Sequence, residues 1–169
     1  MLMRSTIFSA IFLISLDLRA EVSVLFSPNG GVKGEIIERL NQATDHIDIA
    51  MYSFSDKDIL EVVKNRSRDG VPIRLILNKA QRRGALSSEL VSAGIKVRYI
   101  IPVMHHKFAI IDGSRNSHNL RDDSILITGS ANWSKRSNTD YDEDVLIFKD
   151  QQLKIQSYQR EFEHLWKYA

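Results

Sequence analysis

The stretch MHHKFAIID, residues 104–112, places two histidines and a lysine at the head of an apolar run. The residues that follow Lys107 are typical of a buried β-strand. Side chains alternate between the two faces of a strand, so His105 and Lys107 share one face and His106 points to the other. An imidazole can act as nucleophile, acid or base near neutral pH, and a lysine beside it can hold an anionic oxygen. On its own, however, a histidine two residues from a lysine is weak evidence for a reaction centre.

A second polar stretch, GSANWSKRSNTDYDED at residues 129–144, strengthens that interpretation. Gly129, Ser130 and Asn132 close a predicted strand, and hydroxyl and amide groups bind phosphate oxygens as neutral donors. Glu143 begins the next predicted strand, and a carboxylate behind an imidazole fixes its tautomer and stabilises its charged form. Together the two stretches indicate a site for a phosphate-like group.

Apolar patterning predicts the elements that carry these stretches. Strands are expected at residues 21–27, 46–54, 72–78, 96–101, 107–112, 124–130 and 143–149, and helices at 33–44, 56–70, 85–94 and 152–169. In the first half strands alternate with helices, which favours parallel crossover units. We therefore expect an α/β fold with a mixed, mostly parallel β-sheet flanked by helices on both faces.

Length and composition favour one domain after a targeting segment. The chain has 169 residues, no cysteine and a net charge of +2, so no thiolate metal site or disulfide can form. Arg4, an apolar run over residues 5–16 and Leu18 with Ala20 before a possible cut have the layout of a secretory signal peptide. We expect 1–20 to be a signal peptide or N-terminal anchor, and 21–169 to be a single domain that is exported to the periplasm, the cell envelope or the medium.

The pattern H-x-K-x4-D at residues 105–112, followed by G-S-x-N at 129–132, resembles the signature of the phospholipase D superfamily. The surrounding strands are similar to those of its small bacterial endonuclease branch, which carries one motif per chain. The resemblance covers residues 22–165. It implies the phospholipase D-like fold and a phosphodiesterase that needs neither metal nor other cofactor.

The resemblance also implies a role for each motif residue. His105 would be the nucleophile that forms a phosphohistidine, and Lys107 and Asn132 would hold the phosphoryl oxygens with Ser130 in support. Glu143 would orient His105 from behind. Asp112 belongs to the motif, and its implied role is to anchor the motif's loop.

One motif gives only one of the two histidines that this reaction needs. None of His46, His106, His118 and His164 lies in a second H-x-K pattern. The small members of the family solve this as homodimers, and a two-fold axis brings identical residues face to face. We therefore expect a homodimer with one shared active site. The loop at 113–123 is either a substrate wall or a solvated hairpin tip.

Basic and aromatic residues near the motifs favour nucleic acid as the substrate. Lys79, Arg82 and Arg83 follow a predicted strand, where α/β folds place their sites. Further along the chain, Lys135 and Arg136 follow Asn132, and Trp133 and Tyr141 are candidates for base stacking. Each of these residues has an ordinary alternative, as a solvated loop residue or, for Trp133, as part of the core. As a set they favour single-stranded DNA, with RNA as a further possibility.

Two alternatives remain open from the sequence. A phospholipase D-type lipid phosphodiesterase would show an apolar lip or an amphipathic helix near the motif, whereas the apolar stripe of 152–169 indicates a helix that faces the core. An exported DNA-binding or uptake module would not need intact catalytic residues. Membrane contact is expected only through the N-terminal segment, if that segment is retained.

Overall fold

The strands and long helices form close to where the patterning places them. The computed structural model describes residues 21–115 and 123–169, so the expected targeting segment lies outside the described residues. The strands are β1 (Glu21–Phe26), β2 (Ile47–Met51), β3 (Ile73–Asn78), β4 (Lys96–Ile100), β5 (Lys107–Ile111), β6 (Ile125–Gly129) and β7 (Asp144–Lys149). The helices are α1 (Val32–Asn41), α2 (Lys57–Arg68), α3 (Ala85–Ser92), α4 (Lys135–Thr139) and α5 (Gln152–Tyr168), with a 3-10 turn η1 (Lys79–Gln81). The patterning did not predict the short elements η1 and α4.

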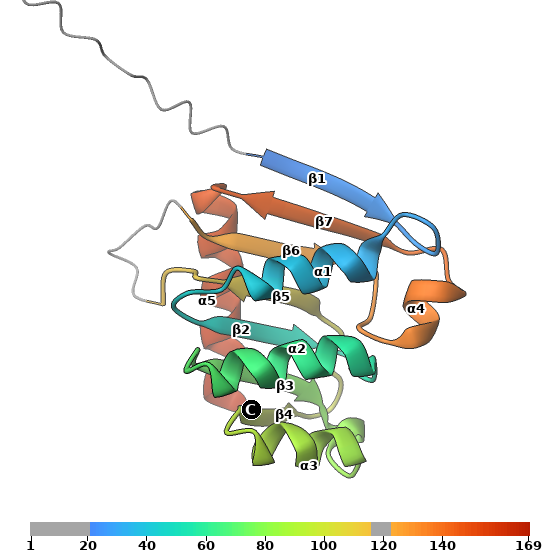
Figure 1. The fold of residues 1–169 in the computed structure, drawn as a ribbon. Helices are drawn as coiled ribbons and strands as arrows, with labels where there is room; N and C mark the ends of the chain where they lie inside the picture. The colour runs from blue at the N-terminus through green and yellow to red at the C-terminus, as the bar shows by residue number, and fades with distance from the viewer. Residues whose placement is uncertain (1–20, 116–122) are drawn as a thin grey trace, which may run out of the picture.

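The seven strands form one sheet in the order β1-β7-β6-β5-β2-β3-β4 (Figure 1). Only β2–β3 and β3–β4 pair in parallel, while the other four pairings are antiparallel. The expectation of a mostly parallel sheet is therefore wrong in that detail. A parallel connection needs a crossover of a dozen or more residues, which α2 and α3 provide between β2, β3 and β4. The segment between β6 and β7, which contains α4, instead returns the chain antiparallel beside β6.

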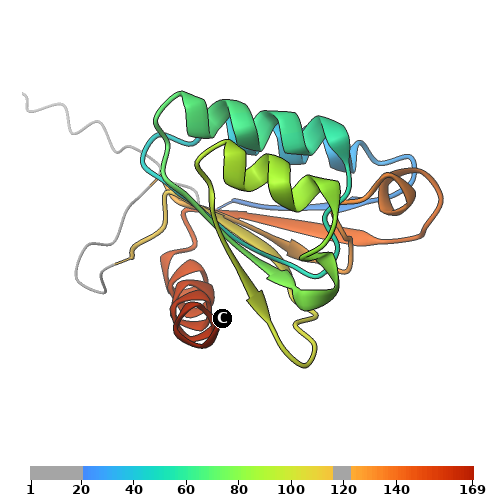
Figure 2. The same ribbon diagram turned by 90° about the horizontal axis from the view of Figure 1, so that it is seen from below.

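Helices cover both faces of the sheet, as expected (Figure 2). Helices α1, α2 and α3 lie on one face, and α5 lies on the other. The larger apolar cluster fills the space under α1–α3, and a smaller one, with Phe108 and Phe162 at its centre, lies under α5. Burial of these two clusters fixes the sheet between the helices, since burial of apolar surface is the main favourable term in folding.

A buried ionic network joins α5 to the sheet. Asp48 on β2 is fully buried and accepts hydrogen bonds from Arg74 (2.6 and 2.8 Å), its cross-strand neighbour on β3, and from Arg115 (2.7 and 3.1 Å). Gln159 and Glu163 of α5 complete the network through Asp48 and Arg74. Burial alone would raise the pKa of Asp48, but hydrogen bonds from the two arginines outweigh it and hold that pKa below its ordinary value.

No helix in the described residues is long and apolar enough to cross a membrane.

The Asp48 network predicts a stability that falls in acid. Because the pKa of Asp48 is lowered on folding, its contribution is present above the unfolded value of about 3.9 and is lost as the pH falls through the folded value. Asp48→Asn takes the carboxylate away from two half-buried arginines and leaves, among the described residues, Arg115 without a charge partner and Arg74 with Glu163 alone, so we expect a loss of about 3 kcal/mol or more at pH 7. Urea unfolding at pH 7 and pH 3 measures both effects.

The exposed Asp142→Asn is the control and should leave the free energy of unfolding unchanged at both pH values. A loss below about 1 kcal/mol for Asp48→Asn at pH 7 would contradict the assigned role of the network.

Candidate active site

The antiparallel pairing of β5 with β2 places the H-x-K motif at the carboxyl ends of β2 and β3. Lys107 lies opposite Met51, the last residue of β2, and the Tyr52 amide donates to the His106 carbonyl (2.8 Å). Figure 1 shows that α4 lies at this same end of the sheet. The two sequence stretches therefore meet here, although they are separated by β5 and β6.

His105, Lys107 and Tyr52 form the centre of the site. The Lys107 ammonium lies 3.2 Å from His105 Nδ1 and donates to the His105 carbonyl (3.1 Å). The Tyr52 ring packs against the His105 ring, with 4.4 Å between centroids. An ammonium has three donors, so one remains free for a phosphoryl oxygen. Burial lowers the pKa of Lys107, and the charge of Glu143 partly opposes that shift.

His106 points to the opposite face of the strand, as the alternation of side chains predicts. Its Nε2 lies 3.5 Å from Glu161 of α5, and its ring packs edge-on against Phe108. Helix α5 covers the face of the sheet away from His105 and Tyr52. His106 is therefore separated from the reaction centre by the strand itself.

The G-S-x-N stretch is shaped by the neighbouring strand β7. Gly129 has a φ of +151°, and a Cβ there would lie 2.2 Å from the Asp144 carbonyl oxygen, so no other residue fits. Ser130 donates through its hydroxyl to Glu143 and accepts from the Asp144 amide (3.0 Å). Within the described residues, no hydrogen bond joins Glu143 to His105. The expected contact from behind His105 is thus absent, and Glu143 acts on Ser130 and, through its charge, on Lys107.

The Asn132 side chain binds the segment that follows β2. Its Oδ1 accepts a hydrogen bond from the Ser53 amide (3.1 Å), which follows β2, whereas its Nδ2 bonds to none of the described residues. The next residue, Trp133, is 1 % exposed and packs edge-on against Phe54. The expectation that Trp133 stacks on bases is therefore wrong, because it is the core residue that holds the Asn132 segment in place.

Asp112 lies at the far end of β5, about 17 Å along the strand from Lys107. It is 2 % exposed and accepts four hydrogen bonds of 2.8–2.9 Å, from the Thr44 amide and hydroxyl and from the Asp45 and His46 amides. This arrangement ties β5 to the turn before β2. Asp112 is too distant to contact a phosphate held by Lys107, and it has the anchoring geometry that the resemblance implies.

The basic residues after β3 gather beside the motif. Lys79, Arg82 and Arg83 are exposed and line a cavity of about 640 Å³, which Pro102 borders from the loop that leads to His105. Sequence position predicted this placement at the carboxyl end of β3.

A second group of basic and aromatic residues lies on and after α4. Lys135 and Arg136 are exposed, and the Arg136 guanidinium lies 4.8 Å from the ring centroid of Tyr141, which is 41 % exposed. Tyr141 therefore remains accessible for stacking, unlike Trp133.

The first residues of the 113–123 loop, Gly113 to Arg115, do not form a substrate wall. They leave β5 at the end away from Lys107, and Arg115 binds Asp48. His118 and Arg121 lie outside the described residues. His46 is buried beside Asp45 at the start of β2, and His164 packs on Tyr168 of α5 and lies near Ser114 and Arg115, so neither is at the end of the sheet that holds His105.

Two features of the site were not found in the sequence. Tyr52 was counted only as part of a strand, yet it touches the His105 ring. Ile101 and Val103 were not assigned to a surface, yet they are 63 % and 64 % exposed in the loop before the motif. Strand patterning gives no signal for either feature, because each depends on how the chain folds back after β2 and β4.

No group of three or more His, Asp or Glu side chains in the described residues is placed to hold a metal ion.

Fold and site together define a domain of the phospholipase D-like class. The sequence profile of the family described as "Cardiolipin synthase, PLD-like domain" matches residues 36–166, and the chain belongs to this family. The fold is similar to that of Nuc from Salmonella typhimurium, described as a phospholipase D family member, with a TM-score of 0.76 and 21 % sequence identity over 89 % of this chain and 96 % of Nuc. It is also similar to that of NucT from Helicobacter pylori, with a TM-score of 0.75 and 21 % sequence identity over 89 % of this chain and 98 % of NucT.

Among characterised relatives, a mitochondrial cardiolipin hydrolase from Chlamydomonas reinhardtii is 34 % identical over 134 residues. The match covers 77 % of this chain and 55 % of that relative, so the chain spans little more than half the length of the relative.

The geometry predicts different effects for the three residues at the head of β5. His105→Ala should lower turnover by at least about a thousandfold, because it removes the attacking atom. Lys107→Ala should cost about a hundredfold or more, because a phosphoryl oxygen loses its charged donor. His106→Ala, on the other face, should keep turnover within about threefold of the wild-type value. Steady-state kinetics on a small phosphodiester measure all three.

Far-UV circular dichroism on each variant is the folding control. If His106→Ala were as inactive as His105→Ala while folded, the assignment of the two faces would be wrong.

Proposed function

We propose that the protein is a metal-independent endonuclease that hydrolyses single-stranded nucleic acid, with DNA favoured and RNA possible. The observation that carries this proposal is the convergence of His105, Lys107 and Asn132 beside a cavity lined by Lys79, Arg82 and Arg83. The cations suit the phosphates that flank the cleaved bond. The exposed Tyr141 offers a stacking surface for bases.

In the proposed reaction His105 attacks the phosphorus atom, and the bond from phosphorus to the leaving oxygen breaks. Lys107 and the Asn132 amide stabilise the charge on the non-bridging oxygens. A general acid protonates the leaving oxygen, which departs as an alcohol. Water, deprotonated by the same group, then attacks the phosphohistidine, and cleavage of the phosphorus–nitrogen bond restores His105.

The general acid in this proposal is His105 of a second chain. His46 and His164 point elsewhere, and His106 faces α5. A two-fold axis near the motif brings the two copies of His105 together in one cleft. Mutual repulsion then keeps one imidazole neutral as nucleophile while the other carries the proton. The proposed assembly is a homodimer with one shared site.

The proposal includes export, with residues 1–20 as a signal peptide or anchor. The layout of the sequence supports it. Membrane contact through a retained N-terminal segment would place the domain at the surface of the cell envelope.

A lipid phosphodiester is the second candidate substrate. The exposed Ile101 and Val103 beside the motif are an apolar lip of the kind that a lipid phosphodiesterase needs, and they stand next to the cations after β3. The similarity to the Chlamydomonas cardiolipin hydrolase favours the same candidate. The site chemistry fits either diester.

Metal independence and substrate class are tested together. We expect the purified protein of residues 21–169 to cut labelled single-stranded DNA in excess EDTA. A histidine supplies the nucleophile and a lysine stabilises the phosphoryl charge, which are roles that a metal ion has in other nucleases. Single strands should be cut faster than duplex, and affinity should fall as salt rises. Rates on single-stranded DNA, duplex DNA, RNA, phosphatidylcholine and cardiolipin vesicles are compared under one set of conditions.

Loss of cleavage in EDTA with recovery in magnesium would refute the mechanism. Faster hydrolysis of either lipid than of any nucleic acid, lowered by Ile101→Asp with Val103→Asp but not by Leu153→Asp on α5, would instead establish the lipid candidate. Leu153 is a suitable control because it is 78 % exposed and lies on the other face of the sheet.

The shared site predicts that activity depends on dimerisation. Specific activity should fall on dilution in step with the loss of dimer seen by analytical ultracentrifugation. General acid catalysis is typically worth about 100-fold to 10,000-fold, so the monomer should be weaker by such a factor. Full activity of a demonstrated monomer would show that the acid lies within one chain.

A further inference from the structure

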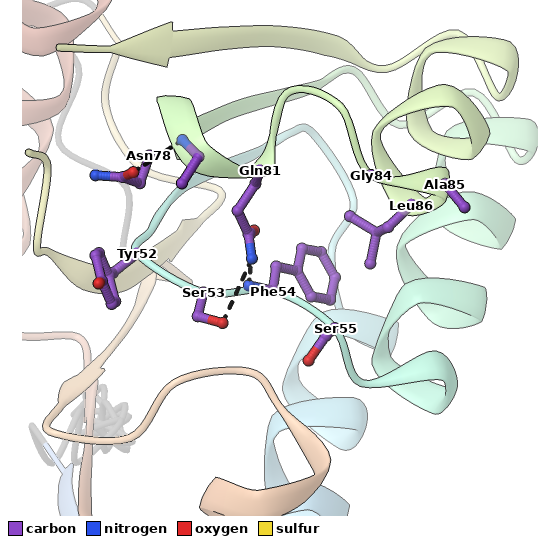
Figure 3. A pocket seen from close by; sticks show the side chains of 10 residues that line it. Tyr52, Ser53, Phe54, Ser55, Asn78, Gln81, Gly84, Ala85 and Leu86 are labelled. Atoms are coloured by element: carbon purple, nitrogen blue, oxygen red, sulfur yellow. Dashed lines mark hydrogen bonds between the residues drawn. The ribbon is translucent and has the colours of Figure 1, made fainter.

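A cavity next to the motif has no part in the reaction as proposed. It has a volume of about 430 Å³ and lies between the end of β2 and the turn from η1 into α3 (Figure 3). Tyr52, Ser53, Asn78, Gln81 and Ala85 are among the residues that line it. Its size is in the range of cavities that hold small organic groups.

Tyr52 connects this cavity to the reaction centre. Its ring packs against His105, with 4.4 Å between centroids, and also lines the cavity. The cavity therefore begins one aromatic ring away from the nucleophile. In an in-line displacement the leaving group departs on the side opposite the nucleophile. A cavity on the nucleophile's side thus suits the substituent that stays on phosphorus.

Asn78 brings an unused hydrogen-bond donor to the same place. The side chain is 6 % exposed, and its Oδ1 accepts from the Ala80 amide (3.0 Å) at the start of η1. Its Nδ2 is buried and bonds to none of the described residues. Figure 3 shows Asn78 and Tyr52 at the same end of the cavity. A buried donor without a partner is unfavourable, so an acceptor brought by a ligand would be bound there.

Gln81 holds two sides of the cavity together before any ligand binds (Figure 3). Gln81 accepts from the Phe54 amide (2.9 Å) through Oε1 and contacts the Ser53 hydroxyl (3.4 Å) through Nε2. These contacts hold the segment after β2 against η1. The cavity is thus preformed, which lowers the cost of binding.

We propose that this cavity is the subsite for the nucleoside that remains attached to the phosphohistidine. The base lies against the Tyr52 ring, and a rotation of the Asn78 side chain brings Nδ2, which is buried in the unbound structure, to a carbonyl oxygen or a ring nitrogen of the base. Asn78 also lines the adjacent cavity of Lys79, Arg82 and Arg83, which takes the next phosphate of the strand. This inference rests on the proposed nuclease function and adds the place and the partner of the base.

Two small diesters with the same leaving group test the subsite. Thymidine 4-nitrophenyl phosphate carries a base, whereas methyl 4-nitrophenyl phosphate does not. The 3′ and 5′ isomers of the thymidine diester are both assayed, and the faster one is used. We expect kcat/KM to favour the thymidine diester by about tenfold or more, since base stacking and one hydrogen bond add together. Ala85→Trp fills the cavity and should reduce that preference to near unity, with little change on the methyl diester.

Asn78→Asp tests the hydrogen bond separately, because it keeps an oxygen for the Ala80 amide but has no donor. It should lower the preference for the thymidine diester about fivefold or more. Ser88→Trp, an exposed position on α3 outside the cavity, is the matched control and should retain the full preference.

The failures of the two proposals are distinguishable. If single-stranded DNA is cut but Ala85→Trp keeps the wild-type preference for the thymidine diester, the proposed subsite is refuted and the proposed nuclease function is retained. If the methyl diester is hydrolysed but neither thymidine isomer nor DNA is a better substrate, both are wrong. A preference for a phosphatidyl 4-nitrophenyl diester that Ala85→Trp removes would assign the cavity to a lipid and overturn the inference.

Discussion

The antiparallel pairing of β2 with β5 is the contact on which the site depends. It joins a parallel unit, β2-β3-β4, to an antiparallel unit that contains β5, β6 and β7. Because the two strands run in opposite directions, the residues that enter β5 meet those that leave β2. His105 and Lys107 thereby reach Tyr52, and the cations that follow β3 lie beside them. A slip of one residue in this register would turn His105 to the α5 face and expose His106 instead.

Two anchors hold that register at its ends. At one end Asp112 ties the exit of β5 to the turn before β2, and at the other the Tyr52 amide binds the His106 carbonyl. The buried Asp48 network then fixes α5 over the opposite face. The polar residues of the core thus set the position of the motif, while the apolar clusters supply most of the stabilisation.

The sequence was sufficient for the strands, the longer helices and the two faces of the motif, but not for the short elements η1 and α4 or for what depends on long-range contacts. Alternation predicts the strands and the two faces of His105 and His106, because it is a local property. The direction in which two strands pair is not a local property, and so the expectation of a mostly parallel sheet was wrong. Trp133 follows a site residue in the chain yet is buried against Phe54. Tyr52 and Asn78 join the site only because β2 and β3 end side by side.

Covalent trapping of the intermediate tests the central claim most directly. The protein is mixed with single-stranded DNA, quenched in base, where phosphohistidine survives, and mapped by peptide mass spectrometry. The proposed mechanism predicts an adduct on His105 alone, with at most one per two chains. An adduct on His106 or on another residue, or turnover in which no adduct accumulates even when the water-dependent step is slowed, would contradict it.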